Sequence, residues 1–255
     1  MSAYRGVVSE RSTPPPSSDA SPDEEPSGTP RTRSSGHLRT LAEFVIALTV
    51  LALIQGFVVK AYQIPSASME QTLETGDRIL VNRLDSSIER GDVVVFEHGD
   101  TWDTTHKSPS DNPLINAARF VGSVVGFGPS TRAYTVKRVI ATGGETVSCC
   151  DDQGRITIDG VGLDEDYLGS NFGWDPGTND CSGTAVSMRC LPEIVVPEGS
   201  LFVLGDNRTN SADSAVSCRG RVGTEECARF VRESQVVGPV IARFWPPSHI
   251  GGIPR

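Results

Sequence analysis

The segment Tyr134-Thr135-Val136-Lys137-Arg138-Val139-Ile140 decides the fold class, because it is short, apolar and rich in β-branched residues. Such residues favour strands, and a run of this length suits a strand better than a helix. Similar runs bounded by glycine, aspartate or proline occur on both sides of it, at 78–81, 92–96, 155–158, 193–196, 201–204 and 236–244. Apart from a short helical pattern near Ser68–Leu73, the sequence therefore predicts a mostly β protein beyond residue 61.

An uncharged apolar segment, residues 44–59, precedes these strands. Extended to 38–60, it is long enough for a transmembrane helix. A buried core helix or the apolar part of an uncleaved export signal would share this pattern. Basic residues are denser before the segment than directly after it, namely Arg31, Arg33 and Arg39 against Lys60. The positive-inside rule then places the N-terminus in the cytoplasm and residues 61–255 on the outer side of the membrane.

Composition limits what lies on either side of this helix. Residues 1–37 are dominated by Ser, Pro, Thr and acidic residues, which predicts a disordered cytoplasmic tail, although a proline-rich docking role would fit as well. The chain has a formal net charge of −9, and its basic residues are not clustered. A nucleic-acid partner is therefore not expected, whereas the lipid bilayer is. Residues 98–131 are polar and contain three prolines, so they are predicted to form a long surface excursion.

All six cysteines follow residue 140, in the part predicted to lie outside the cytoplasm. An even number in an oxidising space suits disulfides, although buried reduced thiols would also be consistent. Cys218 and Cys227 bracket a loop rich in Gly, Arg and Glu, so we expect them to pair. The sequence leaves the pairing open for the other four, which are Cys149, Cys150, Cys181 and Cys190.

Lys137 is the first candidate for chemistry, because it is one of only three lysines and lies within the apolar run. Burial disfavours an ammonium and lowers its pKa, which can leave a neutral amine near pH 7. A guanidinium cannot be deprotonated in this way, so lysine rather than arginine is informative here. The alternative is a lysine whose stem packs on the sheet while its head reaches water.

A base needs a nucleophile, and Ile64-Pro65-Ser66-Ala67-Ser68-Met69 supplies two small hydroxyl residues. Taken alone, this segment is also typical of a turn in which Ser68 caps a short helix. A third polar segment, residues 204–214, follows a buried strand and could orient a base, form a turn or bind calcium, although the full calcium-loop pattern is absent. The histidines lack an obvious carboxylate partner, and neither G-x-S-x-G nor H-E-x-x-H occurs.

Together with the apolar segment, these motifs resemble bacterial type I signal peptidases. The resemblance covers roughly residues 38–247 and rests on four motifs in order, at 62–69, 90–96, 136–145 and 205–214. It implies two antiparallel β parts, the smaller inserted at about 147–199. It also implies that no metal or organic cofactor is needed.

The resemblance assigns roles to individual residues. Ser68 would be the nucleophile and Lys137 its general base. Ser66 and the backbone N–H of Ser68 would form the oxyanion hole, and Ser211 would hydrogen-bond and orient the Lys137 amine. Asp206 would pair with Arg138, and Asp213 would support that region. Ala215 and Val216 stand where the family commonly has arginine, so Asp213 needs another partner, such as Arg219 or Arg221.

The implied function is an endopeptidase that cuts exported preproteins after small residues, in a bacterial cell membrane. An extended substrate would bind as an added strand against Ile64, Pro65, Met69, Leu73 and Val136. Trp245 is expected either at the bilayer surface or in a core. We expect a monomer. Two rivals are a related Ser-Lys protease with another substrate and a non-catalytic, membrane-anchored, disulfide-bonded β binding module.

Overall fold

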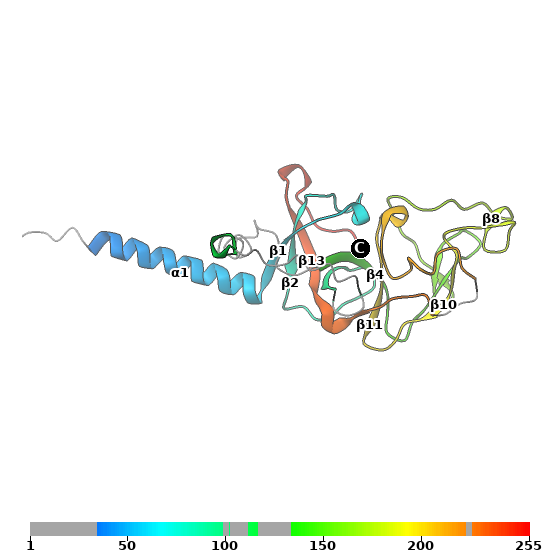
Figure 1. Cartoon of the computed structure of the whole chain (residues 1–255), viewed down its shortest axis with the longest axis horizontal. Coiled ribbons are helices and arrows are strands. Elements are labelled where there is room, and N and C mark those ends of the chain that lie inside the picture. The colour runs from blue at the N-terminus through cyan, green and yellow to red at the C-terminus, as the bar shows by residue number, and fades with distance from the viewer. Residues whose placement is uncertain (1–34, 99–101, 103–111, 117–133, 223–225) are drawn as a thin grey trace, which may run out of the picture. The chain divides into compact units, whose positions relative to one another are not determined.

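The structure is a computed structural model that describes residues 35–98, 102, 112–116, 134–222 and 226–255. Within these ranges it contains one long helix, α1, a short α-helical turn at residues 113–116, and otherwise strands and 3-10 turns, so the protein is mostly β (Figure 1). Residues 1–34 of the predicted disordered tail and most of the predicted surface excursion lie outside the described residues, whereas residues 35–37, also predicted to belong to the tail, are the first residues of the helix.

Helix α1 spans Ser35–Phe57. Among the described residues, Gly36–Ile54 is the one helical stretch long and apolar enough to cross a membrane, and none of it is buried in the protein. The predicted end of the helix at residue 60 is wrong. The helix ends at Phe57, and strand β1, Val59–Gln63, follows it. This strand pairs with β2, Arg78–Asn82, where its backbone donors and acceptors find partners.

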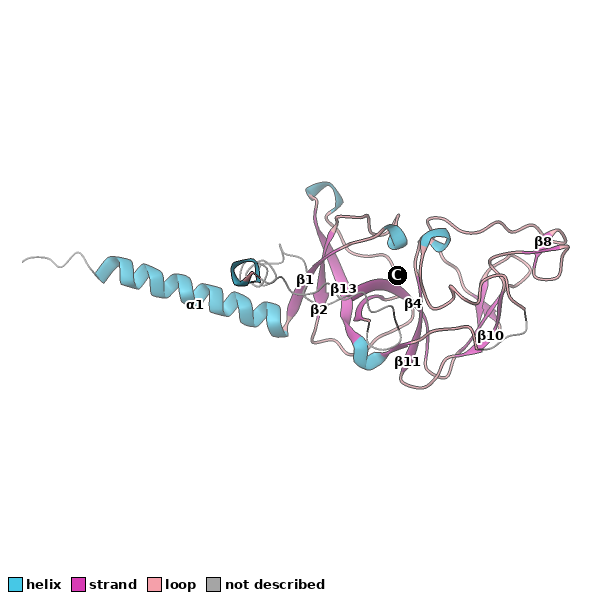
Figure 2. Ribbon diagram, viewed as in Figure 1, coloured by secondary structure: helices cyan, strands magenta, loops and turns pink. Residues whose placement is uncertain are grey.

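The larger sheet has seven strands in the order β1-β2-β13-β3-β4-β11-β12, and every pair in it is antiparallel (Figure 2). Its other strands are β3 Val93–Glu97, β4 Tyr134–Thr142, β11 Ser200–Leu204, β12 Val231–Arg232 and β13 Val236–Trp245. The predicted run Tyr134–Ile140 lies in β4. It lies inside the sheet, since β3 pairs with residues 134–138 and β11 with residues 138–142.

The segment between β4 and β11 forms a second, four-stranded antiparallel sheet in the order β10-β5-β6-β7. Its strands are β5 Thr146–Cys149, β6 Ile156–Ile158, β7 Val161–Gly162 and β10 Leu191–Val195. A further pair, β8 Asn179–Asp180 and β9 Ala185–Val186, is parallel. We call residues 146–196 the insertion.

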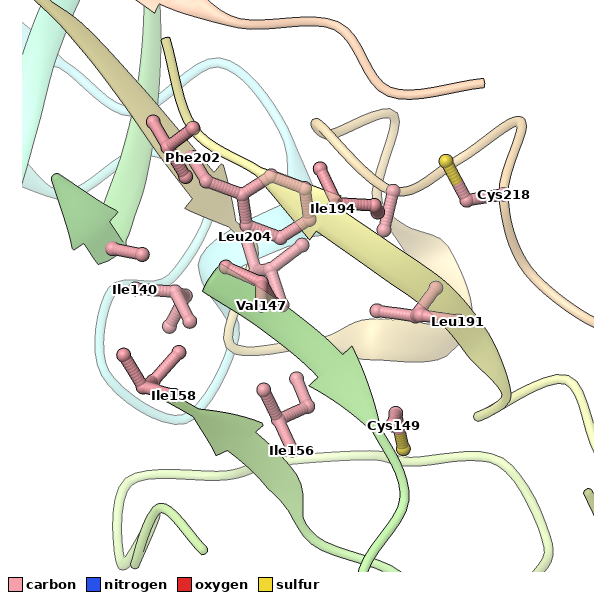
Figure 3. Close-up of a cluster of buried hydrophobic side chains, with 13 residues drawn as sticks. Ile140, Val147, Cys149, Ile156, Ile158, Leu191, Ile194, Phe202, Leu204 and Cys218 are labelled. Carbon is pink, nitrogen blue, oxygen red and sulfur yellow. The ribbon is translucent and has the colours of Figure 1, made fainter. Parts of the chain in front are cut away.

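One buried apolar cluster joins the insertion to the larger sheet (Figure 3). Val147 and Ile158 of the insertion pack in it with Ile140 of β4 and Phe202 and Leu204 of β11. Burying apolar side chains from both sheets in one cluster contributes stability at about 25 cal/mol per Å² removed from water. The insertion therefore packs directly on the strands that flank the candidate site.

Three disulfides connect the described cysteines. The predicted pair Cys218–Cys227 is confirmed. The other bonds, which the sequence left open, are Cys149–Cys150 and Cys181–Cys190. The sulfurs of Cys150, Cys181 and Cys190 lie within 4.8 Å of one another, the one such group of possible metal ligands among the described residues. Each is already in a disulfide, however, and metals are bound by thiolates.

Candidate active site

Ser68 lies on a turn directly after β1. The chain leaves the strand at Ile64, whose N–H donates to Asp77 O at 2.8 Å and whose carbonyl accepts from Gly76 N at 2.9 Å. These bonds close a loop that contains the 3-10 helix Ala67–Met69. The predicted helix through Leu73 is thus a single turn, with Ser68 inside it rather than capping it. Ser68 is 8% exposed, so its hydroxyl is largely shielded from water.

Lys137 reaches this turn from β4, with 3% of its surface exposed. Its Nζ lies 2.6 Å from Ser68 Oγ and 2.9 Å from the carbonyl oxygen of Val136. An ammonium would donate to both oxygens, whereas a neutral amine can accept the Ser68 hydroxyl proton through its lone pair. The two residues are 69 positions apart in sequence, and the fold brings them into hydrogen-bond contact.

The environment favours the neutral form of this amine. Burial lowers the pKa of Lys137 from 10.5 to about 8, and the carboxylates of Asp213 and Asp206 act in the opposite direction. Desolvation has the larger effect on the pKa, because the Nζ is enclosed and the two carboxylates are hydrogen-bonded to arginines rather than to it. A lysine with a pKa near 8 has an appreciable neutral fraction at physiological pH, which a general base requires.

Ser66 lies beside the pair, with its Oγ 3.4 Å from Ser68 Oγ. The residue is exposed, so its hydroxyl is free to rotate toward a bound group. The expected role in an oxyanion hole is compatible with this position.

The expected contact between Ser211 and the Lys137 amine is not formed. Ser211 Oγ is buried and has no hydrogen-bond partner. It lies instead against Gly205, where an added Cβ would be 2.4 Å from Ser211 Oγ and 2.4 Å from Ser68 O. The amine already contacts Ser68 Oγ and Val136 O. Gly205 is needed at this position because a side chain there would collide with the backbone of the nucleophile turn.

Asp206 and Arg138 form a fully buried, two-pronged ion pair, as the resemblance implied. The Arg138 Nε and Nη2 donate to the Asp206 carboxylate at 2.9 and 2.7 Å, and both side chains are 0% exposed. Thr72 Oγ1 donates to the same carboxylate at 2.5 Å, which links the pair to the segment that follows Ser68. The ring of Tyr167 lies 3.7 Å from the guanidinium. Thr72 and Tyr167 were not identified from the sequence, which offers no local signal for such distant contacts.

Asp213 finds its partner in Arg219, one of the two arginines considered. Arg219 Nη2 donates to both carboxylate oxygens, at 2.9 and 2.8 Å. Asp213 also accepts from Gly205 N at 3.2 Å, which fixes the end of β11 next to the nucleophile turn. A third buried pair, Arg208 with Glu165, was missed because Glu165 lies in the insertion, far from Arg208 in the sequence.

Four of the five expected substrate-binding residues lie in one apolar cluster beneath the site: Ile64, Met69, Leu73 and Val136. They are 0 to 4% exposed, and Leu73 has no exposed surface, so it can shape a binding surface only from behind. Pro65 is exposed. Trp245 is 50% exposed and therefore does not lie in a core.

Histidines do not contact the Ser68–Lys137 pair among the described residues. His98 Nε2 lies 2.6 Å from Thr135 Oγ1. His249 has a carboxylate partner that the sequence did not indicate, since its Nδ1 is 3.1 Å from Asp77 Oδ1. His106 lies outside the described residues.

Comparison with known proteins places this chain in a family. The family profile described as "Signal peptidase, peptidase S26" matches residues 37–245. Signal peptidase I of Mycobacterium tuberculosis is 36% identical over 252 residues, covering 91% of this chain and 84% of the relative. The probable signal peptidase I of Mycobacterium leprae is 38% identical over 226 residues, covering 82% of this chain and 76% of the relative. A crystal structure of a signal peptidase I from Enterococcus faecalis aligns with a TM-score of 0.31 and 25% identity, over 60% of this chain and 96% of that one.

A mostly β peptidase fold with a serine and a buried lysine in contact is thus the class of protein defined here. The chain belongs to the signal peptidase family, peptidase S26, and its curated relatives are signal peptidases I.

Proposed function

We propose that this protein is a membrane-anchored serine endopeptidase that removes N-terminal signal peptides from exported preproteins, with Ser68 as nucleophile and Lys137 as general base. The single observation that carries the proposal is the 2.6 Å contact between Lys137 Nζ and Ser68 Oγ in a site where both residues are buried. Membership in the signal peptidase family supports the substrate class.

In the proposed mechanism, the neutral Lys137 amine takes the Ser68 hydroxyl proton as Ser68 Oγ attacks the scissile carbonyl carbon. The resulting ammonium then protonates the leaving amine, and an acyl group remains on Ser68. Water that gives its proton to the same amine then attacks the ester, and the ammonium returns this proton to the departing Ser68 Oγ, which releases the second product and restores the neutral amine. A lysine pKa of about 8 suits both directions of this transfer.

The oxyanion formed in the attack needs donors. We assign this role to the Ser66 hydroxyl and to the backbone N–H of Ser68. The 3.4 Å separation between the two serine hydroxyl oxygens is consistent with both residues facing one reacting carbonyl. Removing one such donor costs about 3 kcal/mol of transition-state stabilisation in comparable enzymes.

Substrate binding would occur as an added strand along the end of β4. Strand β11 pairs only with residues 138–142 of β4, whereas Lys137 and Tyr134 contact Ser68 Oγ and Gln63 O of the facing segment. An extended peptide between these segments would bond to backbone groups, and the buried Ile64 and Val136 leave little depth for a large side chain. This is our basis for a preference for small residues such as alanine before the cut.

Helix α1 would anchor the enzyme in the cell membrane with the tail in the cytoplasm and the β region outside. The length and apolar composition of Gly36–Ile54 support a membrane span, and the basic residues before it support this orientation. Protease added to the outside of intact cells should digest the region beyond residue 61 and spare the tail. Digestion of the tail alone would reverse the orientation.

The function is tested with purified full-length protein in detergent and a preprotein carrying an Ala-x-Ala site. We expect one cut after this site, lost in Ser68→Ala and in Lys137→Ala. Lys137→Arg should be equally inactive, because a guanidinium cannot accept the proton. Ser86→Ala and Lys60→Ala are matched controls that should cut normally. Full activity in a Ser68 or Lys137 variant would remove this pair from the mechanism.

A further inference from the structure

Asn207 makes three hydrogen bonds to the turn that carries the nucleophile. Its side-chain Nδ2 donates to Ala67 O at 3.2 Å and to Glu70 Oε2 at 3.1 Å. Its backbone N–H donates to Ser68 O at 3.2 Å. The residue is 7% exposed, so these bonds are largely shielded from competing water.

These contacts hold both peptide planes that meet at the Ser68 Cα. Ala67 O belongs to the peptide whose N–H is that of Ser68, and Ser68 O belongs to the next peptide. A trans peptide is planar, so fixing the direction of the Ala67 carbonyl also fixes the opposite direction of the Ser68 N–H. Because both planes are held, the backbone dihedral angles of Ser68, and with them the starting direction of its side chain, are restricted.

Asn207 is itself held from the other side. Gly169 N donates to Asp206 O at 3.1 Å, and Arg208 N donates to Ser170 O at 2.8 Å, so a segment of the insertion flanks the residues on either side of Asn207. The Asp206 side chain is bound by Arg138 and Thr72. The donors of Asn207 therefore project from a fixed backbone, which a positioning group requires.

We infer that Asn207 is a positioning residue that aims the Ser68 N–H at the oxyanion and keeps Ser68 Oγ within reach of Lys137. The inference rests on the proposed function, because it assigns the Ser68 N–H to the oxyanion hole. Asn207 itself touches neither the substrate nor the reacting atoms. Its contact with Glu70 belongs to the exposed edge of the turn, so the bond to Ala67 O is the one that matters for the rate.

The experiment separates these two contacts with Asn207→Asp, Glu70→Gln and the double variant. Aspartate has the shape of asparagine but cannot donate to Ala67 O, and it repels Glu70. In the double variant, the glutamine introduced at position 70 can donate to the aspartate introduced at position 207, which restores that side-chain pair. Ala67 O then keeps only its 3.2 Å bond from the backbone N–H of residue 70 and lacks the one from residue 207. We expect Asn207→Asp to lower kcat tenfold to a hundredfold with KM changed less than about twofold, part of the effect of losing an oxyanion donor.

Glu70→Gln alone should keep kcat, since the Asn207 amide still binds Ala67 O. The double variant should regain the thermal midpoint of the wild type but not its kcat. A wild-type kcat in Asn207→Asp, or in the double variant, would overturn the inference. If the wild-type enzyme cuts no preprotein at all, the proposed function fails instead, before any variant is compared.

Discussion

The larger sheet around Lys137 and the insertion are stabilised in different ways. Near Lys137, charged groups are buried and paired, as in Arg138 with Asp206 and Arg219 with Asp213. Within the insertion itself, the Arg155–Asp164 ion pair is exposed and the Cys181–Cys190 disulfide closes a loop, while its one buried charge noted above, Glu165, pairs with Arg208 outside the insertion. A buried charge pair is sensitive to the loss of either partner, whereas a disulfide acts mainly through the unfolded state. Changes in the two regions should therefore separate effects on rate from effects on stability.

The largest effect is expected for Lys137→Met, which should lower cleavage by about a thousandfold or more. The same change should stabilise the protein at pH 7, because it removes a buried charge. The pKa of Lys137 falls from 10.5 to about 8 on folding. The loss of folding free energy from burying this charge is therefore complete below pH 8 and disappears as the pH rises to 10.5. The gain at pH 7 should be up to about 3 kcal/mol.

Denaturant unfolding of the wild type and of Lys137→Met across this pH range measures the difference between their free energies of unfolding. A difference in the free energy of unfolding that is the same at pH 7 and at pH 10.5 would show that burial of the amine does not cost stability.

Asp206→Asn should lower the free energy of unfolding by about 3–5 kcal/mol, because it leaves the Arg138 cation buried without its carboxylate. It should also lower the pKa of Lys137 further, since the Asp206 charge acts to raise it. Glu89→Gln is the matched control. It breaks an ion pair with Arg255 whose side chains are 65% and 67% exposed, so the expected change is within about 0.5 kcal/mol. Equal losses in the two variants would contradict the distinction between buried and exposed pairs.

Two disulfides of equal span sharpen the comparison further. Cys181–Cys190 and Cys218–Cys227 each have a sequence separation of 9, so removing either should cost about 2–3 kcal/mol. The Cys181→Ser and Cys190→Ser double variant changes only the insertion, so its kcat/KM should stay within about twofold of the wild-type value. Cys218→Ser with Cys227→Ser should also reduce kcat/KM several-fold, because Cys218 directly precedes Arg219, the partner of Asp213. Identical values of kcat/KM for the two double variants would show that the Cys218–Cys227 disulfide does not affect the active site through Arg219.

The strand pattern of the larger sheet could be read from the sequence where the runs are long enough. The segment Tyr134–Ile140 became β4, and Leu201–Leu204 lies in β11. Strand β1 was hidden because the apolar composition of the preceding helix continues into it. Two-residue strands such as β7 and β8 carry no periodicity at all.

The candidate site was predicted from resemblance more than from spacing. The contact between Lys137 and Ser68 bridges 69 positions, and the one between Asn207 and Ala67 bridges 140, so neither could follow from local pattern. Ser211 was wrongly expected to bond the amine, because sequence order does not give the direction of a side chain in a turn. The bond between the adjacent Cys149 and Cys150 also had no signal in composition.

The most direct test of the account is the pH dependence of kcat/KM for preprotein cleavage, which reports the ionisation of the free enzyme. Activity should rise with pH, with unit slope and a midpoint near 8, because only the neutral Lys137 amine can take the Ser68 proton. The midpoint should be lower in Asp206→Asn. A flat profile between roughly pH 6 and 9, or the same midpoint in Asp206→Asn as in the wild type, would contradict the assignment of Lys137 as the base.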